Sequence, residues 1–169
     1  MAYALRVAVA KATAVRDSRA GLSGSRAGEA GPSRADRVPS RSGDGVLAAD
    51  TVVALDGVIF GKARDAAEAE VFLARLSGRT HAVHTALALR ADGRLVTDLV
   101  TTRVRFRVLA SAEIARYVAG GEPADKAGAY GIQGEGGALV AEVQGSYTNV
   151  VGLPLEETLR LLRLHGVIE

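Results

Sequence analysis

The stretch VLAADTVVAL, residues 46–55, constrains the fold of this chain more than any other feature of its sequence. Its apolar residues predict a buried strand, yet Asp50 interrupts them with a charge. A carboxylate buried without a partner costs several kcal/mol, so this one must be paired or lie at a strand end that faces a cleft. In α/β sheets, ligands bind outside the carboxyl ends of strands. Two interpretations of Asp50 stand open: a cap or salt bridge, and a metal ligand or general base.

The composition bounds the class of protein. The chain has 169 residues, of which 48% are hydrophobic, enough for one domain with a core. No apolar run approaches the roughly 18 residues of a membrane span, and the N-terminus does not resemble a secretory signal. The absence of cysteine excludes a disulfide framework, a thiolate metal site and a cysteine nucleophile. We therefore expect a cytoplasmic protein without a membrane partner.

The charge pattern does not indicate nucleic-acid binding. The net charge is +2, which is too balanced to attract a polyanion by itself. Arg103, Arg105 and Arg107 alternate with apolar residues, a pattern typical of a strand with one solvated face. The arginines between residues 16 and 45 are interleaved with acids and lack aromatic neighbours for stacking. We expect no nucleic-acid partner.

The chain divides into three parts. Residues 1–15 contain an amphipathic helix, in which Leu5, Ala8, Ala12 and Val15 fall on one face. Residues 16–45 are rich in Gly, Ser, Arg and Pro and lack periodicity, which predicts a disordered insert. Residues 46–169 carry regular patterns and form the main domain.

The main domain alternates predicted strands and helices. The predicted strands are 46–55 with a hairpin turn after it, 82–90, 95–109 and 138–143. The predicted helices are 66–76 with Asp65 as its cap, 112–119 with Ser111 as its cap, and 155–164. In the last helix we expect Leu155, Leu159 and Leu162 to face inward. This alternation predicts an α/β (mixed α+β) fold.

Two loops carry polar residues among small ones. DKAGAYGIQGEGG, residues 125–137, contains Lys126 and Gln133, and its glycines predict backbone amides that approach a ligand closely. GSYTNVVGLP, residues 145–154, adds Ser146 and Asn149, and Lys62 follows Gly61 after the hairpin. Neither loop is a Walker or dinucleotide fingerprint. Lysines, an acid and glycine-rich loops together suggest a phosphorylated ligand with a divalent metal.

The histidines and one tyrosine are weaker candidates. His81 could touch a ligand, His84 alternates with small apolar residues and suggests packing, and His165 is expected on the surface. No two histidines share metal-ligand spacing on a helix. Tyr130 fits a core position and a nucleobase-stacking position equally well.

Four segments follow one another along the chain in an order characteristic of one protein family: AADTVVALDGVIFGK, LSGRTHAVHT, GEPADKAGAYGIQGEGG and GSYTNVVGLPLEET. Together they closely resemble the Maf family of nucleoside triphosphate pyrophosphatases, also described as septum-formation proteins. The helix YALRVAVAKA resembles that family's lysine-bearing helix and aligns Lys11 with its lysine. The resemblance implies a Maf-like, inosine-triphosphatase-like fold with a central mixed sheet and a nucleotide cleft.

The resemblance also implies an activity. Family members hydrolyse a nucleoside triphosphate to the monophosphate and pyrophosphate with a divalent cation, Mg²⁺ or Mn²⁺. Asp50 matches the proton acceptor for the attacking water and a metal ligand, and Lys11, Lys62 and Lys126 match lysines of the phosphate site. Thr51 and Gln133 match positions linked to base choice in the dTTP and UTP branch. A homodimer is also implied.

The chain departs from the family pattern at its start. The family's first strand, its Ser-x-Ser-Pro-Arg-Arg phosphate loop and its Asp-Glu pair have no counterpart in this sequence. We therefore expect an N-terminally truncated member with an open sheet edge. The alternative is a weak or inactive Maf-like protein that binds nucleotide or acts as a cell-division regulator.

Overall fold

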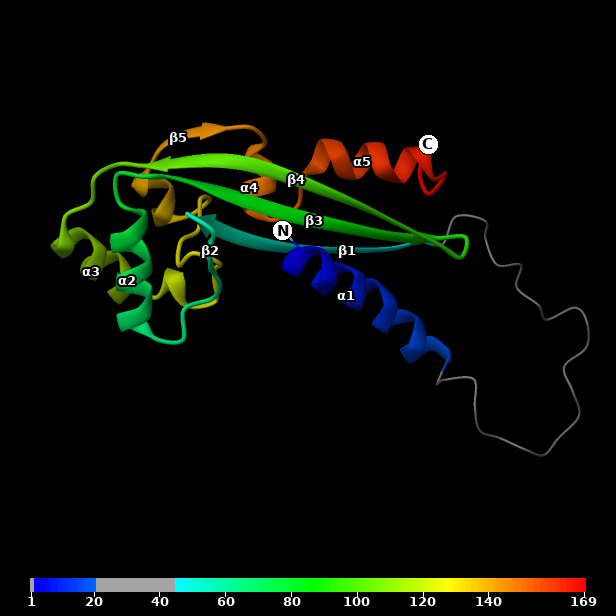
Figure 1. Cartoon of the computed structure of the whole chain (residues 1–169), viewed down its shortest axis with the longest axis horizontal. Helices are drawn as coiled ribbons and strands as arrows, with labels where there is room; N and C mark the ends of the chain where they lie inside the picture. Colours follow the sequence, from blue (N-terminus) through cyan, green and yellow to red (C-terminus); the bar gives the residue numbers. More distant parts are fainter. Residues whose placement is uncertain (1, 21–44) are drawn as a thin grey trace, which may run out of the picture.

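A five-stranded sheet forms the centre of the molecule (Figure 1). The computed structural model describes residues 2–20 and 45–169, with side chains only to residue 14 in the first range. The strands are β1 (Gly45–Leu55), β2 (Val58–Phe60), β3 (Thr80–Ala91), β4 (Arg94–Phe106) and β5 (Val140–Gln144), in the spatial order β2-β1-β3-β4-β5. The mixed α/β class is confirmed. The expected mixed sheet is wrong for the described strands, whose four pairings are all antiparallel.

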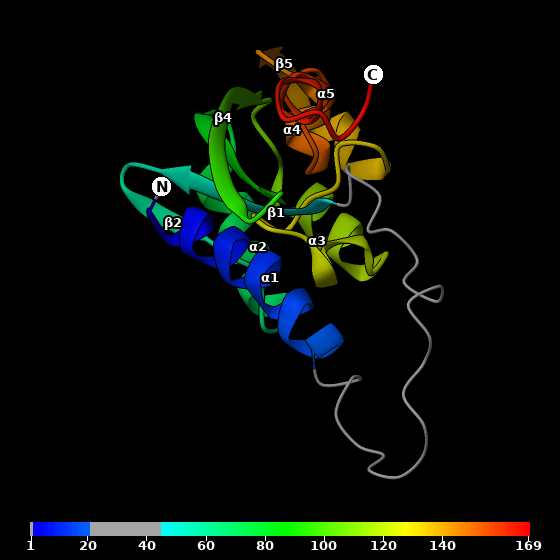
Figure 2. The ribbon, with the colours of Figure 1, turned by 90° about the vertical axis from the view of Figure 1, so that its right-hand side faces the viewer.

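The helices lie on both faces and at one end of the sheet. They are α1 (Ala2–Ala20), α2 (Ala66–Leu76), α3 (Ser111–Ala119), α4 (Tyr147–Val151) and α5 (Leu155–Leu164), with short 3-10 turns η2 (Glu122–Asp125) and η3 (Glu135–Leu139). Figure 2 shows α1 on the opposite side of the sheet from α5. The helices α2 and α3 pack together beyond the end of the strands (Figure 1). None of the helices in the described ranges is long and apolar enough to cross a membrane.

Alternation along β3 separates the two faces. Ala86 and Ala88 pack against α1, whereas Leu87 and Leu89 pack against α5. On the α1 side the contact is made by Ala4, Ala8 and Ala12, all fully buried. Their spacing of four residues places them on one helix face, and their small side chains let α1 approach the sheet closely. Of the predicted stripe, Ala8 and Ala12 are buried and Leu5 is half-buried, and the side chain of residue 15 lies outside the described set.

Several predicted boundaries need correction. α1 continues to Ala20, so residues 16–20 are helical and do not belong to the predicted insert, and residues 21–44 lie outside the described residues. The strand predicted to 109 ends at Phe106. Ser111 is the first residue of α3 and not its cap, because Ala110 occupies the cap position with extended backbone. The prediction of Asp65 as the cap of α2 is confirmed, since its Oδ1 accepts from the Glu68 amide at 2.8 Å.

The inward face of α5 was predicted correctly for Leu162, which is half-buried and packs against the cluster of Leu87 and Leu161, but wrongly for two other leucines. Leu155 and Leu159 are 49% and 40% exposed, whereas Thr158 and Leu161 are buried. Pro154, itself buried, precedes the helix and its carbonyl accepts from the Thr158 amide at 2.9 Å. The helix therefore packs on the sheet through Thr158 and Leu161, four and seven residues after Pro154. Leu155 and Leu159 lie on a different face of the helix.

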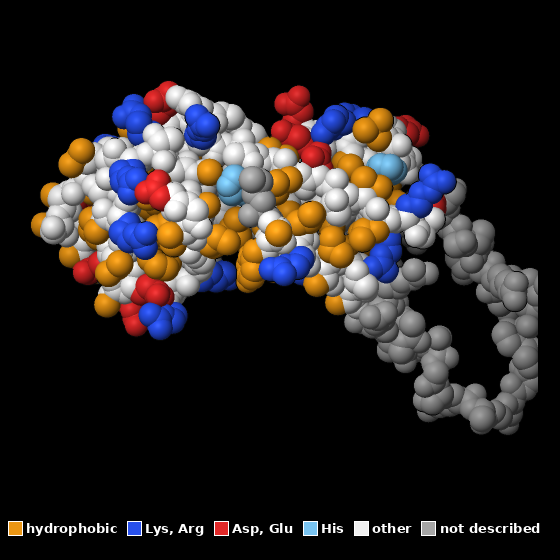
Figure 3. All heavy atoms as spheres, viewed as in Figure 1, with side chains coloured by type: hydrophobic (Ala, Val, Ile, Leu, Met, Phe, Trp, Pro, Cys, Tyr) orange, Lys and Arg blue, Asp and Glu red, His pale blue; other side chains and the backbone are white. Residues whose placement is uncertain are grey.

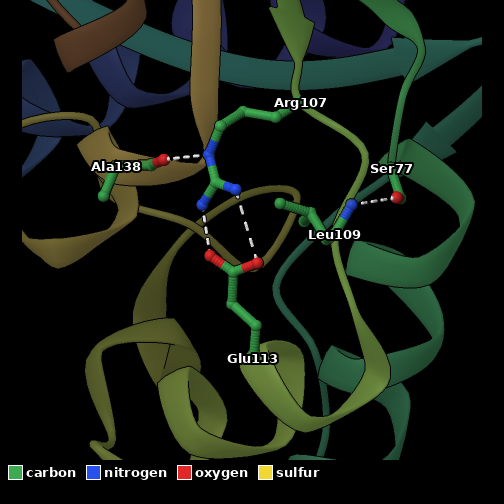
Figure 4. A network of polar contacts seen from close by, with 5 residues as sticks. All are labelled: Ser77, Arg107, Leu109, Glu113 and Ala138. Carbon is green, nitrogen blue, oxygen red and sulfur yellow. Dashed lines mark hydrogen bonds and ion pairs between the residues drawn. The ribbon is translucent and has the colours of Figure 1, made fainter.

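Arg107 ties the end of the sheet to the helices beyond it (Figure 4). Its Nε donates to the Ala138 carbonyl at 2.6 Å, and its two terminal nitrogens bind the Glu113 carboxylate of α3. Hydrogen bonding to this guanidinium lowers the pKa of Glu113. Nearby, the Leu109 amide donates to Ser77 Oγ at 2.8 Å at the end of α2. These contacts hold α2, α3 and η3 in fixed positions relative to β4.

His81 belongs to the core of this end of the molecule. It is 2% exposed, its Nε2 lies 2.9 Å from the Tyr130 hydroxyl, and its ring stands edge-on to Phe106. Tyr130 is also buried, as its core interpretation requires, and it lines the cleft described below as well. Burial lowers the pKa of His81 to about 4, and its Nδ1 has no hydrogen-bond partner among the described residues. His81 is therefore a neutral packing residue.

The buried His81 predicts a loss of stability on mild acidification. The unfolded chain protonates this imidazole below its ordinary pKa of 6.5, whereas the folded chain does so only near about 4. The unfolded state thus binds more protons between these values, and stability falls as the pH falls through this window. We expect the free energy of unfolding to drop by roughly 2 kcal/mol between about pH 7 and about pH 5, measured by urea unfolding.

The control for this prediction is His84. Its pKa is also lowered by burial, but the residue is only partly buried. His81→Phe is expected to remove most of the loss, and His84→Gln to remove less. An undiminished pH dependence in His81→Phe would show that another group is responsible.

Candidate functional site

A cleft of about 570 Å³ is lined by the six residues that the family resemblance assigned to the site, whereas Ser146 and Asn149 do not line it. Lys11 comes from α1, Asp50 and Thr51 from β1, Lys62 from the segment after β2, and Lys126 and Gln133 from the loop between η2 and η3. These residues are up to 122 positions apart in sequence, from Lys11 to Gln133. On the face drawn in Figure 3, hydrophobic side chains gather along α1 and the neighbouring sheet, and basic and acidic side chains are interspersed on the lobe of α2 and α3.

The cleft surrounds one edge of β1. β2 pairs only with residues Val53–Leu55 of β1, so within the described residues the edge of 45–52 has no neighbour on the side opposite β3. Successive side chains of a strand point to opposite faces. Asp50 accordingly meets Lys11 of α1 on one face, and Thr51 meets Thr85 of β3 on the other. Two adjacent residues can both line the cleft because it reaches around this edge.

Asp50 is paired. Lys11 Nζ lies 2.7 Å from its Oδ1 and also donates to the Ala49 carbonyl at 3.3 Å. The side chains of Lys11 and Asp50 are 53% and 17% exposed. The charge inside the apolar run is therefore accommodated by a cation from α1 and by access to solvent at the open edge.

The positive charges of the cleft are lysines. The sequence contains only three lysines, against 18 arginines, and all three line the cleft. Lys126 Nζ lies 2.5 Å from the Asp125 carboxylate, whereas Lys62 is exposed and makes no side-chain hydrogen bond in the described part of the chain. Since an ammonium is a compact charge with donors that rotate freely, this distribution suits a polyanion held in the cleft.

Glu122 is a residue of the cleft that the sequence did not reveal. Its carboxylate accepts from the Tyr117 hydroxyl at 3.0 Å, the Glu135 amide at 2.8 Å and the Gly136 amide at 3.1 Å. Burial raises the pKa of Glu122, but these donors outweigh burial and the net pKa is lowered. No local pattern signals this role, because the two amides that bind Glu122 follow it by 13 and 14 residues.

Glu122 changes the explanation of the glycine-rich loop. The sequence suggested that amides of this loop approach a ligand, but those of Glu135 and Gly136 bind the chain's own carboxylate. A Cβ on Gly131 would lie 2.8 Å from Glu122 Oε1, and one on Gly136 would lie 2.6 Å from the Tyr117 hydroxyl. The glycines therefore let the loop close around Glu122 and Tyr117.

The carboxylates limit how a metal could be held. Within the described ranges no group of three or more His, Cys, Asp or Glu side chains is arranged to bind a metal ion. Of the cleft carboxylates, Glu122 is held by the loop amides and Asp125 by Lys126. Mg²⁺ is commonly held by one or two carboxylates together with water and substrate phosphates. Asp50 at the open edge fits such a site.

Thr51 and Gln133 differ in how firmly they are held. Thr51 Oγ1 lies 2.8 Å from Thr85 Oγ1, and Thr85 Oγ1 donates to the Asn149 carbonyl at 3.1 Å. Gln133 is exposed, and its amide has no hydrogen bond to the described residues. Thr51 is thus fixed by buried neighbours, whereas Gln133 is free to turn.

The packing of Gly136 predicts the cost of adding one methyl group. In Gly136→Ala the new Cβ would also lie 2.7 Å from the Gly131 carbonyl oxygen, a backbone atom. Such overpacking destabilises a folded domain by roughly 1–3 kcal/mol. Gly61→Ala is the matched control, because apart from its chain neighbours no described residue has a heavy atom within 4 Å of the added Cβ. Urea unfolding of both variants checks the prediction, and equal midpoints would contradict it.

Comparison with known proteins gives a consistent result. The family described as Maf-like protein matches residues 1–165. Proteins named dTTP/UTP pyrophosphatase are 57% identical in Bordetella parapertussis, 59% in Myxococcus xanthus and 58% in Methylococcus capsulatus, each over 122 residues. The matched segment is 72% of this chain and 59%, 62% and 60% of those relatives. The chain thus spans less than two thirds of the length of the curated relatives that it matches.

Proposed function

This chain belongs to the Maf-like protein family, and from that membership we propose that it is a nucleoside triphosphate pyrophosphatase acting on dTTP and UTP. The names of its relatives support the substrates. The observation that carries the proposal is the convergence of Asp50 and all three lysines on one cleft. The products are the nucleoside monophosphate and pyrophosphate.

The proposed reaction assigns each charge a role. Water attacks the α-phosphorus, the bond from that phosphorus to its bridging oxygen breaks, and pyrophosphate leaves. The reaction needs the negative charge of three phosphates to be neutralised. We assign this to Lys62 and Lys126, and we assign the water's proton to Asp50, whose carboxylate Lys11 orients at 2.7 Å.

A divalent cation, Mg²⁺ or Mn²⁺, belongs to the proposal. Asp50 would hold it together with phosphate oxygens of the substrate. When bound, such a cation supplies charge stabilisation to the phosphoryl oxygens. Thr51 of β1 and Gln133 of the loop before η3, which both line the cleft, are proposed to contact the base.

Pyrophosphate release tests the proposal directly. The chain is offered dTTP, UTP, CTP, dATP and 7-methyl-GTP with magnesium or manganese. Release from dTTP and UTP is expected, with a loss of roughly 10²–10³ or more in Asp50→Asn. Asp98→Asn is the matched control, because Asp98 also lies on a strand and pairs with an arginine, Arg160, at 2.8 Å, yet is not in the cleft.

The outcomes separate the candidate activities. Release that persists in Asp50→Asn would remove Asp50 from the mechanism. A folded chain that binds nucleotide without releasing pyrophosphate would overturn the enzymatic proposal in favour of a nucleotide-binding Maf-like protein.

Lys62 gives an independent prediction. Because its ammonium has no ion pair among the described residues, its loss should mainly affect the phosphates. Lys62→Met is expected to lower kcat/KM for UTP by roughly 10²-fold. Arg64→Met is the control, since Arg64 is a nearby cation that pairs with Glu68 at 2.9 Å outside this cleft. Equal effects of the two substitutions would indicate a general charge effect and not a phosphate contact.

A further inference from the structure

The hydroxyl of Thr51 has a fixed polarity. Thr85 Oγ1 lies 3.1 Å from the Asn149 carbonyl oxygen, which has no proton to give, so Thr85 is the donor. A threonine hydroxyl has a single proton, and Thr85 uses it in this bond. The 2.8 Å contact between Thr51 Oγ1 and Thr85 Oγ1 therefore requires Thr51 to donate. Thr51 consequently turns only its lone pairs toward the cleft.

Buried anchors keep this arrangement in place. Asn149 and Thr85 are both fully buried. The Asn149 side-chain amide donates to the Val83 carbonyl at 3.1 Å and to Thr102 Oγ1 at 2.9 Å. The backbone carbonyl of Asn149, which accepts from Thr85, also accepts a second hydrogen bond from the Gly152 amide at 3.1 Å. These two bonds fill its acceptor capacity. The direction of the Thr85 bond, and hence that of Thr51, is set inside the core.

The proposed substrates share one feature that such a group can recognise. Thymine and uracil both carry a ring imide N3–H between two carbonyl groups, whereas cytosine has an unprotonated nitrogen at that position. dTTP and UTP differ from each other in a ring methyl and a sugar hydroxyl. A protein that accepts both bases and rejects cytosine can do so by reading the imide face, whose N–H needs an acceptor.

Thr51 is the acceptor in the cleft that suits this task. Asp50 is already assigned to the attacking water and the cation, and Glu122 is held by the loop amides. The amide of Gln133 presents oxygen or nitrogen equally well after a half-turn, so on its own it matches uracil and cytosine alike. Only an acceptor that cannot become a donor rejects the cytosine nitrogen.

We propose that Thr85 and Asn149 are positioning residues that hold Thr51 as an obligate acceptor for the N3–H of uracil and thymine and thereby exclude cytosine. The inference rests on the proposed function, because it takes the substrate bases from there. Base discrimination then depends on two consecutive hydrogen bonds, from the Thr51 hydroxyl to the Thr85 hydroxyl and from there to the buried Asn149 backbone carbonyl.

Binding of UMP, dTMP and CMP, measured by calorimetry, tests the inference without turnover. The wild-type protein should bind UMP and dTMP about tenfold more tightly than CMP, the effect of one mismatched hydrogen bond. Thr85→Val removes the acceptor for the Thr51 proton, so Thr51 can then donate and the ratio should fall close to one. Thr85→Ser keeps the hydroxyl and should restore the ratio.

Thr101→Val is the control, because Thr101 lies on the neighbouring β4 and its hydroxyl bonds His84 at 2.8 Å, outside the cleft. It should keep the wild-type ratio. An unchanged ratio in folded Thr85→Val, or a wild-type protein with no preference for UMP over CMP, would overturn the inference. If Thr85→Val does not fold, Thr51→Val tests the acceptor itself: the ratio should fall to about one, and a wild-type ratio would overturn the inference.

Pyrophosphate release from UTP by the wild-type protein is measured on the same preparation. Selective UMP binding without release contradicts the proposed function and supports this inference. Release without base selectivity supports the proposed function and overturns the inference.

Discussion

The register between β1 and β3 is the constraint on which the cleft depends. Asp50 lies opposite Ala86 and Thr51 lies opposite Thr85. A slip of one residue would turn every side chain of β1 to the other face, so Asp50 would lose Lys11 and Thr51 would lose Thr85. The buried alanines of β3 and α1 on one face, and Val53 with Val83 on the other, make such a slip costly. The hydrophobic core thus fixes the polar geometry.

The cleft is also ordered by its own charges. Asp50 is paired with Lys11, Asp125 with Lys126, and Glu122 with two backbone amides and a tyrosine hydroxyl. Each acid therefore has a donor, and Lys62 is left without an ion pair among the described residues. A polyanionic ligand could bind Lys62 directly. To bind Lys11 and Lys126 it would have to replace their carboxylate partners, an arrangement suited to reversible binding of phosphates.

The six residues proposed for the site reach the cleft in different ways. Lys11 is carried by a helix whose alanine face packs on the sheet, and Asp50 and Thr51 by a strand with an open edge. Lys126 and Gln133 lie in the loop that Glu122 closes. The same loop shows why glycines recur in DKAGAYGIQGEGG, since close approach to Glu122 and Tyr117 leaves no space for a Cβ at Gly131, Gly134 or Gly136.

The sequence by itself determined the strand at 46–55, the capped helix at 66–76, the family and the six residues of the cleft, because periodicity, caps and motifs act over a few residues. The tertiary structure alone decided the phase of α5, which follows Pro154, the role of Glu122 and the polarity of Thr51. These depend on contacts between residues far apart in the chain: Thr51 and Thr85 are separated by 34 positions, and Thr85 and Asn149 by 64. The direction of the Thr85 hydroxyl bond sets the direction of the Thr51 hydroxyl bond at the cleft. No local sequence pattern predicts that direction.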